Sequence, residues 1–114
     1  MKKLASTELA DFLRSCRSER RLAPTTCSAY ERDVSACLAY LQGEGVRDLG
    51  EVKVTHLRAF LASEHNTRPA ASSQARTTAA LKLFFRFLVE EERLLRDPAL
   101  PLRTPKKRGH YPTC

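Results

Sequence analysis

Apolar residues recur at helical spacing in four separate stretches of the chain. The first stretch runs from about Ser6 to Arg20, and its apolar side chains lie at i, i+3, i+4 and i+7: Leu9, Phe12, Leu13 and Cys16. This spacing predicts an amphipathic helix. Ser6 is expected to be its N-cap, because a serine hydroxyl can accept a hydrogen bond from an unpaired amide of the first turn.

The second predicted helix begins at Pro24, a residue favoured in a first turn, and continues to about Gln42, where Gly43 and Gly45 provide a stop. One side of it is apolar and carries Cys27, Tyr30, Val34, Cys37, Leu38 and Leu41. The opposite side is short and mildly polar and carries Thr25, Ser28, Ala29, Arg32, Ser35, Ala36 and Ala39. Solvated faces usually carry long charged side chains of both signs, so this face is expected to meet either a bulky partner or another helix.

A turn-rich connection leads to a short third helix. Val54 and Thr55 are expected at its N′ and N-cap positions, with Leu57, Phe60 and Leu61 facing inward. The helix is expected to stop near Pro69, which punctuates the following loop.

The fourth predicted helix opens at Ser72 or Ser73 and ends near Leu95, before Asp97-Pro98. Its apolar stripe consists of Thr77, Leu81, Phe84, Phe85 and Leu88. Its other side carries basic residues at successive turns, separated by small or apolar residues: Arg76, Lys82 and Arg86. Acids appear on this side only at the end of the helix.

From Ala99 onward the chain contains three prolines and four basic residues and has no helical or strand period. Such a composition predicts an extended basic linker. The sequence therefore predicts an all-α protein, with a small four-helix bundle over residues 1–97 and a basic linker over residues 98–114.

The positive charge of the chain is segregated. The net charge is +7, residues 65–89 carry four basic side chains and no acid, and residues 98–114 carry four more with no acid. The remainder of the chain is therefore close to neutral. Segregated positive charge is typical of proteins that bind a polyanion.

The sequence offers no constellation for catalysis or metal binding. The histidines are scattered, no phosphate-binding glycine loop or HExxH motif occurs, and the four cysteines lack CxxC spacing. Cys16, Cys27 and Cys37 lie on apolar helix faces and are expected to be buried, reduced thiols. No apolar run is long enough to cross a bilayer, so we expect a cytoplasmic protein without membrane, metal or cofactor.

Two helix starts, "PTT" and "SSQ", offer hydroxyls and unpaired backbone amides at helices whose outer faces lack acids. Phosphate oxygens accept hydrogen bonds from such groups, and basic residues along a helix can neutralise several phosphates at once. The sequence therefore predicts that both helices face double-stranded DNA. Ordinary capping of the helix ends is compatible with such contacts.

The same segments resemble a known family. "LAPTTCSAYERDVSACLAYL" is similar to the second-helix signature of tyrosine recombinases (phage integrases and Xer-type enzymes), which here falls on Thr26, Tyr30 and Asp33. The matching positions of the fourth-helix pattern are Ser73, Arg76, Leu81, Lys82, Phe84, Phe85 and Asp97-Pro98. "TPKKRGHYP" resembles the family's Pro-Lys-rich linker, and the resemblance extends from about Leu4 to Pro112.

The resemblance implies the N-terminal core-binding domain, a SAM-like bundle of about four helices. In the family this domain forms half of a clamp around a DNA half-site, and it touches other recombinase protomers in a synaptic complex. The family's catalytic residues lie in a C-terminal domain that these 114 residues do not contain. No catalytic residue is therefore expected here, and the parent protein is expected to be a site-specific recombinase acting in DNA integration and recombination.

The predicted DNA contacts come from three segments and comprise Thr25, Thr26, Ser28, Arg32, Ser72, Ser73, Gln74, Arg76, Lys82, Arg86, Lys106, Lys107 and Arg108. Gln74 and Arg76 are the predicted base readers, since glutamine pairs bidentately with adenine and arginine with guanine. The alternative is a helical protein-interaction module without a nucleic-acid role. In that alternative the second-helix face and Leu83/Phe87 would dock a protein partner.

Overall fold

The computed structural model of the chain describes residues 5–67 and 71–102. It contains four α-helices, α1 (Ser6–Ser18), α2 (Pro24–Gly43), α3 (Val54–Thr67) and α4 (Ala71–Glu90), and a short 3-10 helix η1 (Leu49–Glu51). No strand occurs in the described ranges. The prediction of a small all-α, four-helix bundle is confirmed.

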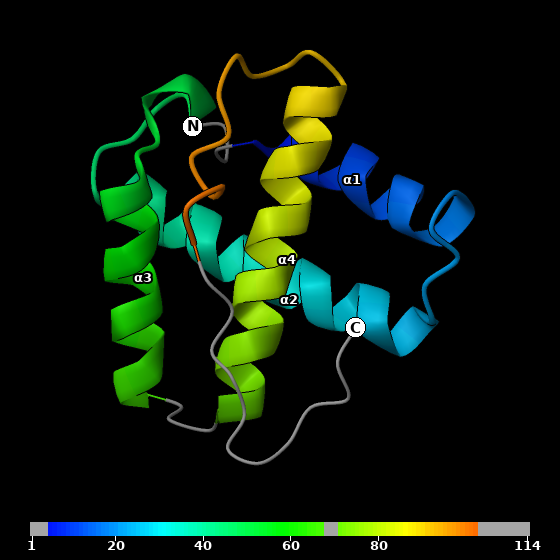
Figure 1. Cartoon of the computed structure of the whole chain (residues 1–114), viewed down its shortest axis with the longest axis horizontal. Coiled ribbons are helices and arrows are strands. Elements are labelled where there is room, and N and C mark those ends of the chain that lie inside the picture. The colour runs from blue at the N-terminus through cyan, green and yellow to red at the C-terminus, as the bar shows by residue number, and fades with distance from the viewer. Residues whose placement is uncertain (1–4, 68–70, 103–114) are drawn as a thin grey trace.

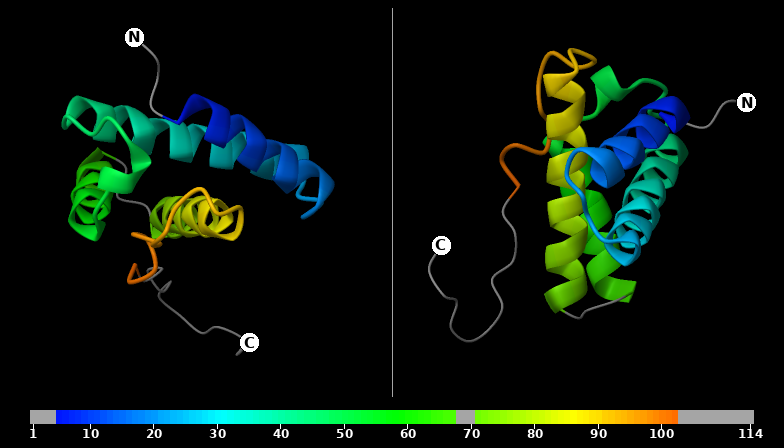
Figure 2. Two further views of the ribbon diagram at one scale, coloured as in Figure 1. Left: turned by 90° about the horizontal axis from the view of Figure 1, so that it is seen from above. Right: turned by 90° about the vertical axis from the view of Figure 1, so that its right-hand side faces the viewer.

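The helices form two layers (Figure 1). α1 and α2 run side by side in one layer, and α3 and α4 cross them in the other, as the view from above shows (Figure 2). Between the layers, Phe12 of α1 packs its ring against Phe84 and Phe87 of α4, with centroids 5.3 and 5.7 Å apart. Edge and tilted ring contacts at these distances are favourable, so the aromatic side chains join the layers.

The apolar stripes predicted from the sequence make up this core. All five stripe positions of α4 are buried, and so are Phe12, Leu13 and Cys16 of α1. Cys27 and Cys37 of α2 are buried too, which confirms the prediction of buried cysteines for the three that the structure describes. Burial raises the pKa of the Cys16 thiol above its ordinary value of 9.0, with a smaller contribution from the neighbouring Cys27.

Three helix starts differ from the prediction, and the nearest is that of α4, which begins at Ala71 and not at Ser72 or Ser73. Ser6 is the first helical residue of α1, and the cap is Ala5, which has φ 58° and makes no side-chain cap hydrogen bond. α3 begins at Val54, with Thr55 already inside the helix. His56 Nδ1 accepts a hydrogen bond from the Lys53 backbone N–H at 3.0 Å. Lys53 is therefore the N-cap in place of Thr55, and the His56 side chain accepts from its backbone N–H, as the N3 side chain does in a capping box.

The two long helices end in the same way, although only one end was predicted. After α2, Gly45 adopts φ 91°, and Val46 N–H donates to Leu41 O at 3.0 Å. After α4, Glu92 adopts φ 58°, and Arg93 N–H donates to Leu88 O at 2.8 Å. Both are Schellman-type ends. The predicted continuation of α4 to Leu95 is wrong, because Glu92 adopts a left-handed conformation that ends the helix. Glycine is the usual residue at such a position, so the sequence does not indicate this end.

The chain beyond α4 turns back onto the bundle. Ala99 is fully buried and Leu102 is 6% exposed, and both belong to the hydrophobic core. The predicted linker over residues 98–114 therefore contains residues that pack as part of the helical body, at least up to Leu102. Residues 103–114 lie outside the described ranges.

Candidate nucleic-acid interface

Arg76, predicted to read a base, is paired with an acid of the neighbouring helix. Its Nε donates to Asp33 Oδ2 at 2.9 Å and its Nη2 donates to Asp33 Oδ1 at 3.0 Å, so the pair is bidentate. The Asp33 side chain is completely buried, whereas that of Arg76 is 35% exposed. The hydrogen bond to Asp33 raises the pKa of Arg76 above its ordinary value. The guanidinium therefore satisfies a buried carboxylate and ties α4 to α2.

Lys82 also points its charge at the protein itself. Its Nζ donates to three backbone carbonyl oxygens of the chain after α4: Ala99 O at 3.4 Å, Leu100 O at 3.2 Å and Leu102 O at 2.6 Å. An ammonium has three N–H donors, so these contacts use its full donor capacity. Lys82 forms no ion pair with a carboxylate in the described ranges.

Arg86 has the most loosely held charge of the three. Its Nε donates to Glu90 Oε2 at 3.2 Å, one helical turn later, and the two side chains are 71% and 51% exposed. Arg20, just after the end of α1, approaches the same carboxylate at 4.0 Å. Exposed pairs of this kind contribute little free energy, so Arg86 can exchange its partner at small cost.

The outer face of α2 presents a different picture. Thr25, Ser28 and Arg32 are exposed and Thr26 is half-buried. Within the described ranges Arg32 makes no ion pair, in contrast to Arg76 and Arg86 of α4. The first turn of α2 contains no acid, and its cap residue Ala23 contributes no side-chain hydrogen bond. The unpaired amides of this turn and the Arg32 guanidinium are thus both available to an anion.

Comparison with known proteins agrees with this helical arrangement. Residues 9–92 match the family described as "Phage integrase, N-terminal SAM-like domain". The chain belongs to this family. The match covers all of α2 and α4, including the Asp33–Arg76 pair that joins them.

The relatives of this SAM-like domain are tyrosine recombinases. The chain is 36% identical over 96 residues to "Tyrosine recombinase XerC" of Pseudomonas syringae pv. tomato, a match that covers 84% of this chain and 32% of the relative. It is 37% identical over 98 residues to the XerC of Bifidobacterium longum, covering 86% and 27%. It is 35% identical over 104 residues to "Tyrosine recombinase XerD" of Lacticaseibacillus casei, covering 91% and 35%. No solved structure matches the chain.

The chain spans about a third of the length of these relatives. The domain therefore corresponds to the N-terminal domain of a tyrosine recombinase, a protein of DNA recombination. No group of histidine, cysteine or acidic side chains suited to a metal ion occurs in the described part of this domain. None of its described helices is long and apolar enough to cross a membrane.

The remaining predicted contacts are only partly covered by the structure. Gln74 is half-buried at the start of α4. The side chains of Ser72 and Ser73 lie outside the described set, although both residues are inside α4, one and two positions after its first residue, Ala71. Lys106, Lys107 and Arg108 lie outside the described ranges. Their roles stay predictions.

Two further basic residues of the SAM-like domain were not among the predicted contacts. Arg17, in the last turn of α1, and Arg21, in the loop before α2, are both exposed, and neither forms an ion pair in the described ranges. Arg17 also lines a shallow hollow with Pro24 and Ser28 of α2. The available signal was the run "RSERRLA" directly before the Pro24 helix start.

The docking surface of the alternative interpretation comprised the outer face of α2 together with Leu83 and Phe87, and the prediction is wrong for Phe87. Phe87 is 6% exposed and packs against Phe12 in the core. Leu83 is half-buried against the same core. Phe87 is therefore not available to a protein partner, whereas the roles of Leu83 and of the α2 face in that interpretation stay predictions.

Proposed function

We propose that this domain binds duplex DNA as one half of a recombinase clamp on a half-site, and that the outer face of α2 meets the phosphate backbone. The observation that carries the proposal is the combination of exposed Thr25 and Ser28 with Arg32, which has no ion-pair partner, on a helix whose first turn contains no acid. Hydroxyls, helix-start amides and an arginine are the groups that contact phosphates in protein–DNA complexes. Arg17 and Arg21 extend the positive charge beyond the start of the helix.

In this proposal some residues of α4 contact DNA and others stabilise the bundle. Arg86 exchanges Glu90 for a phosphate when DNA is present, because its exposed pair is weak. Ser72, Ser73 and Gln74 meet the duplex at the helix start, and Lys106, Lys107 and Arg108 follow the backbone. Arg76 and Lys82 hold the bundle in shape, since their charges satisfy protein groups.

The relatives are named tyrosine recombinases, which connects this binding to recombination. On this basis we propose that the partners of the domain are double-stranded DNA in the cytoplasm and other recombinase protomers in a synaptic complex.

The salt dependence of binding to a mixed-sequence duplex tests the proposal. The logarithm of the binding constant falls with the logarithm of salt concentration by about 0.9 per neutralised phosphate. Arg32→Ala is expected to reduce this slope by about 0.9 and to weaken binding several-fold at fixed salt. Arg47→Ala is the matched control, since this exposed arginine lies beyond the other end of α2 and its side chain forms no ion pair in the described ranges.

Equal slopes for the wild type and the Arg32→Ala variant, with reduced slope for the Arg47→Ala variant, would place the duplex on another face. Absence of binding by the wild type at low salt would reject DNA binding by this domain altogether.

A further inference from the structure

The chain after α4 is folded into a compact turn that starts at Asp97. Asp97 Oδ1 accepts the Ala99 N–H at 2.9 Å, and Asp97 O accepts the Leu100 N–H at 3.2 Å. Leu102 N–H then donates to Ala99 O at 3.0 Å. Ala99 and Leu102 insert into the core from this turn. We call residues 97–102 the exit turn, because the basic tail begins at Arg103.

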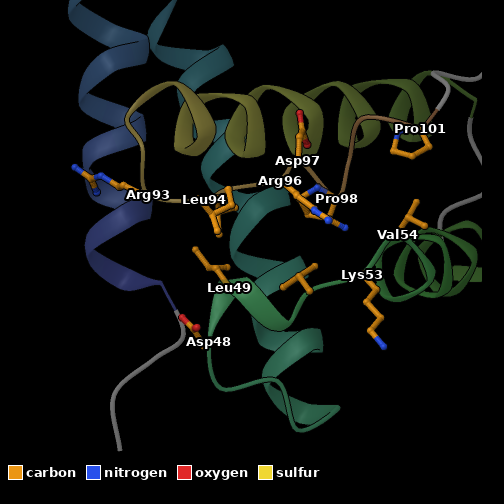
Figure 3. Close-up of a pocket in the computed structure, with 13 residues that line it drawn as sticks. Asp48, Leu49, Lys53, Val54, Arg93, Leu94, Arg96, Asp97, Pro98 and Pro101 are labelled. Carbon is orange, nitrogen blue, oxygen red and sulfur yellow. The ribbon is translucent and has the colours of Figure 1, made fainter.

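Packing supports the exit turn only partly. Figure 3 shows Asp97 and Pro101 beside α4, with Leu49 and Val54 across from them. The same residues line an open hollow of about 620 Å³ between the segment after α4 and the start of α3. Leu100 is 72% exposed. Since one side of the turn faces this hollow and Leu100 faces solvent, hydrogen bonds must supply much of its order.

Lys82 supplies three of those bonds. It reaches across from the middle of α4 and donates to the carbonyl oxygens of Ala99, Leu100 and Leu102, the shortest contact being 2.6 Å to Leu102. These carbonyls belong to the last residues of the turn. Basic side chains near the C-terminal end of a helix stabilise it by donating hydrogen bonds to its last carbonyl oxygens, and Lys82 does the same for this turn. Asp97 caps the start of the turn and Lys82 caps its end.

We propose that Lys82 is a positioning residue that fixes where and in which direction the basic tail leaves the helical body. Its ammonium is a backbone cap and not a phosphate ligand. The part of the proposal that concerns DNA rests on the proposed function, because a fixed exit matters only if the tail follows the phosphate backbone. The capping itself is independent of DNA.

Amide hydrogen exchange of the free protein tests the capping. In Lys82→Gln, exchange of the Leu100 and Leu102 amides is expected to accelerate about tenfold or more, while the amides in the middle of α4 keep their protection. Arg86→Gln is the matched control on the same helix and should change the Leu100 and Leu102 rates by less than about twofold. Asp97→Ala removes the opposite cap and should accelerate the same two amides, which provides a second variant if Lys82→Gln loses its fold.

Unchanged exchange at Leu100 and Leu102 in both Lys82→Gln and Asp97→Ala would overturn the proposal. Acceleration across the whole of α4 in Lys82→Gln, combined with no local effect of Asp97→Ala, would overturn it as well, since Lys82 would then act on the core as a whole.

A double-mutant cycle on duplex binding tests the positioning. The second change replaces Lys106, Lys107 and Arg108 together by alanine. If Lys82 acts through the tail, Lys82→Gln weakens binding in the wild-type background and has no further effect once the tail charges are gone. If Lys82 touches a phosphate itself, the two losses of binding free energy add and the salt slope falls by a further 0.9 or so. That result would overturn the proposal.

Absence of duplex binding by the wild type and by every variant would reject the proposed function. Local exchange effects at Leu100 and Leu102 would still support the cap.

Discussion

The basic row of α4 and the outer face of α2 both looked like DNA-facing surfaces in the sequence, and the structure treats them differently. The row of α4 consists of Arg76, Lys82 and Arg86, and each of these side chains binds a group of the protein itself. On the outer face of α2, Arg32 is exposed and has no such partner in the described ranges. A basic residue within an acid-free stretch is thus not necessarily a free cation, because its acid can come from another helix.

The comparison also separates two kinds of positive charge. Arg76 faces a carboxylate that is buried completely, and Lys82 faces backbone carbonyls near the core. These charges are stabilising only as long as their partners are held in place. Arg32 and Arg86 are exposed, so their replacement should affect ligand binding more than folding.

The largest effect is expected from Arg76→Ala. This change leaves the Asp33 carboxylate buried without its cation, which should reduce the free energy of unfolding by about 3 to 5 kcal/mol. Denaturant-induced unfolding followed by circular dichroism measures the loss. The combination Asp33→Leu with Arg76→Met should recover most of it, because an apolar pair of similar volume leaves no charge uncompensated. A loss below 1 kcal/mol or so for Arg76→Ala would make the pair a surface feature and return Arg76 to the DNA-facing row.

A smaller loss is expected from Lys82→Met. The apolar part of the side chain is retained while three charge-assisted hydrogen bonds to the exit turn disappear, so the free energy of unfolding should fall by about 1 to 2 kcal/mol. Thermal unfolding of the two proteins at equal ionic strength provides the measurement. Because the partners are uncharged carbonyls, the loss should persist in high salt. A loss that vanishes as salt is added would point to long-range charge effects instead.

Arg86→Ala and Arg32→Ala should leave stability within about 0.5 kcal/mol of the wild type, since both side chains are exposed. Their effects should appear in DNA binding, where each should remove about 0.9 from the salt slope. Denaturation and fluorescence titration of the same protein samples give both values. A stability loss above 1 kcal/mol or so for Arg32→Ala would contradict its assignment as a free surface cation.

The smallest effect concerns the core beneath the start of α2. Burial raises the pKa of the Cys16 thiol, so the unfolded chain loses this proton at a lower pH than the folded chain does. The stabilisation is complete below about pH 9 and is lost as the pH rises through the raised pKa of the folded thiol. Unfolding measured from pH 7 to 10 should show this decline in the wild type, with a smaller decline in Cys16→Ala. The same slope in both proteins would exclude Cys16 as its source.

The sequence predicted the helices well because their apolar spacing is local. The stripe of Leu81, Phe84, Phe85 and Leu88 is a property of one segment, and its burial follows from the helical period. Helix ends were predicted where a residue signals them, as Pro24 and Gly45 do. The end of α4 was missed because Glu92 adopts a left-handed conformation that its side chain does not announce.

The candidate site was harder to predict because its decisive contacts are distant in sequence. Asp33 and Arg76 are 43 positions apart, and the helical period of one segment does not indicate a partner in another. The partners of Lys82 are backbone carbonyls, which every residue carries, so the amino-acid types do not reveal the contact. They also belong to a segment that composition assigned to a linker. Such pairings depend on how α2, α4 and the exit turn meet, which only the tertiary structure provides.

The most direct test of the account is a duplex titration of the isotope-labelled protein followed by two-dimensional amide NMR. We expect the signals of Thr25, Ser28 and Arg32 to shift progressively. The Arg76 side-chain Nε–H signal should keep its position, because its bond to Asp33 persists in the complex. Signals of α2 that stay in place while the Arg76 Nε–H and Lys82 signals move would contradict it, because the basic row of α4 would then be the surface that meets DNA.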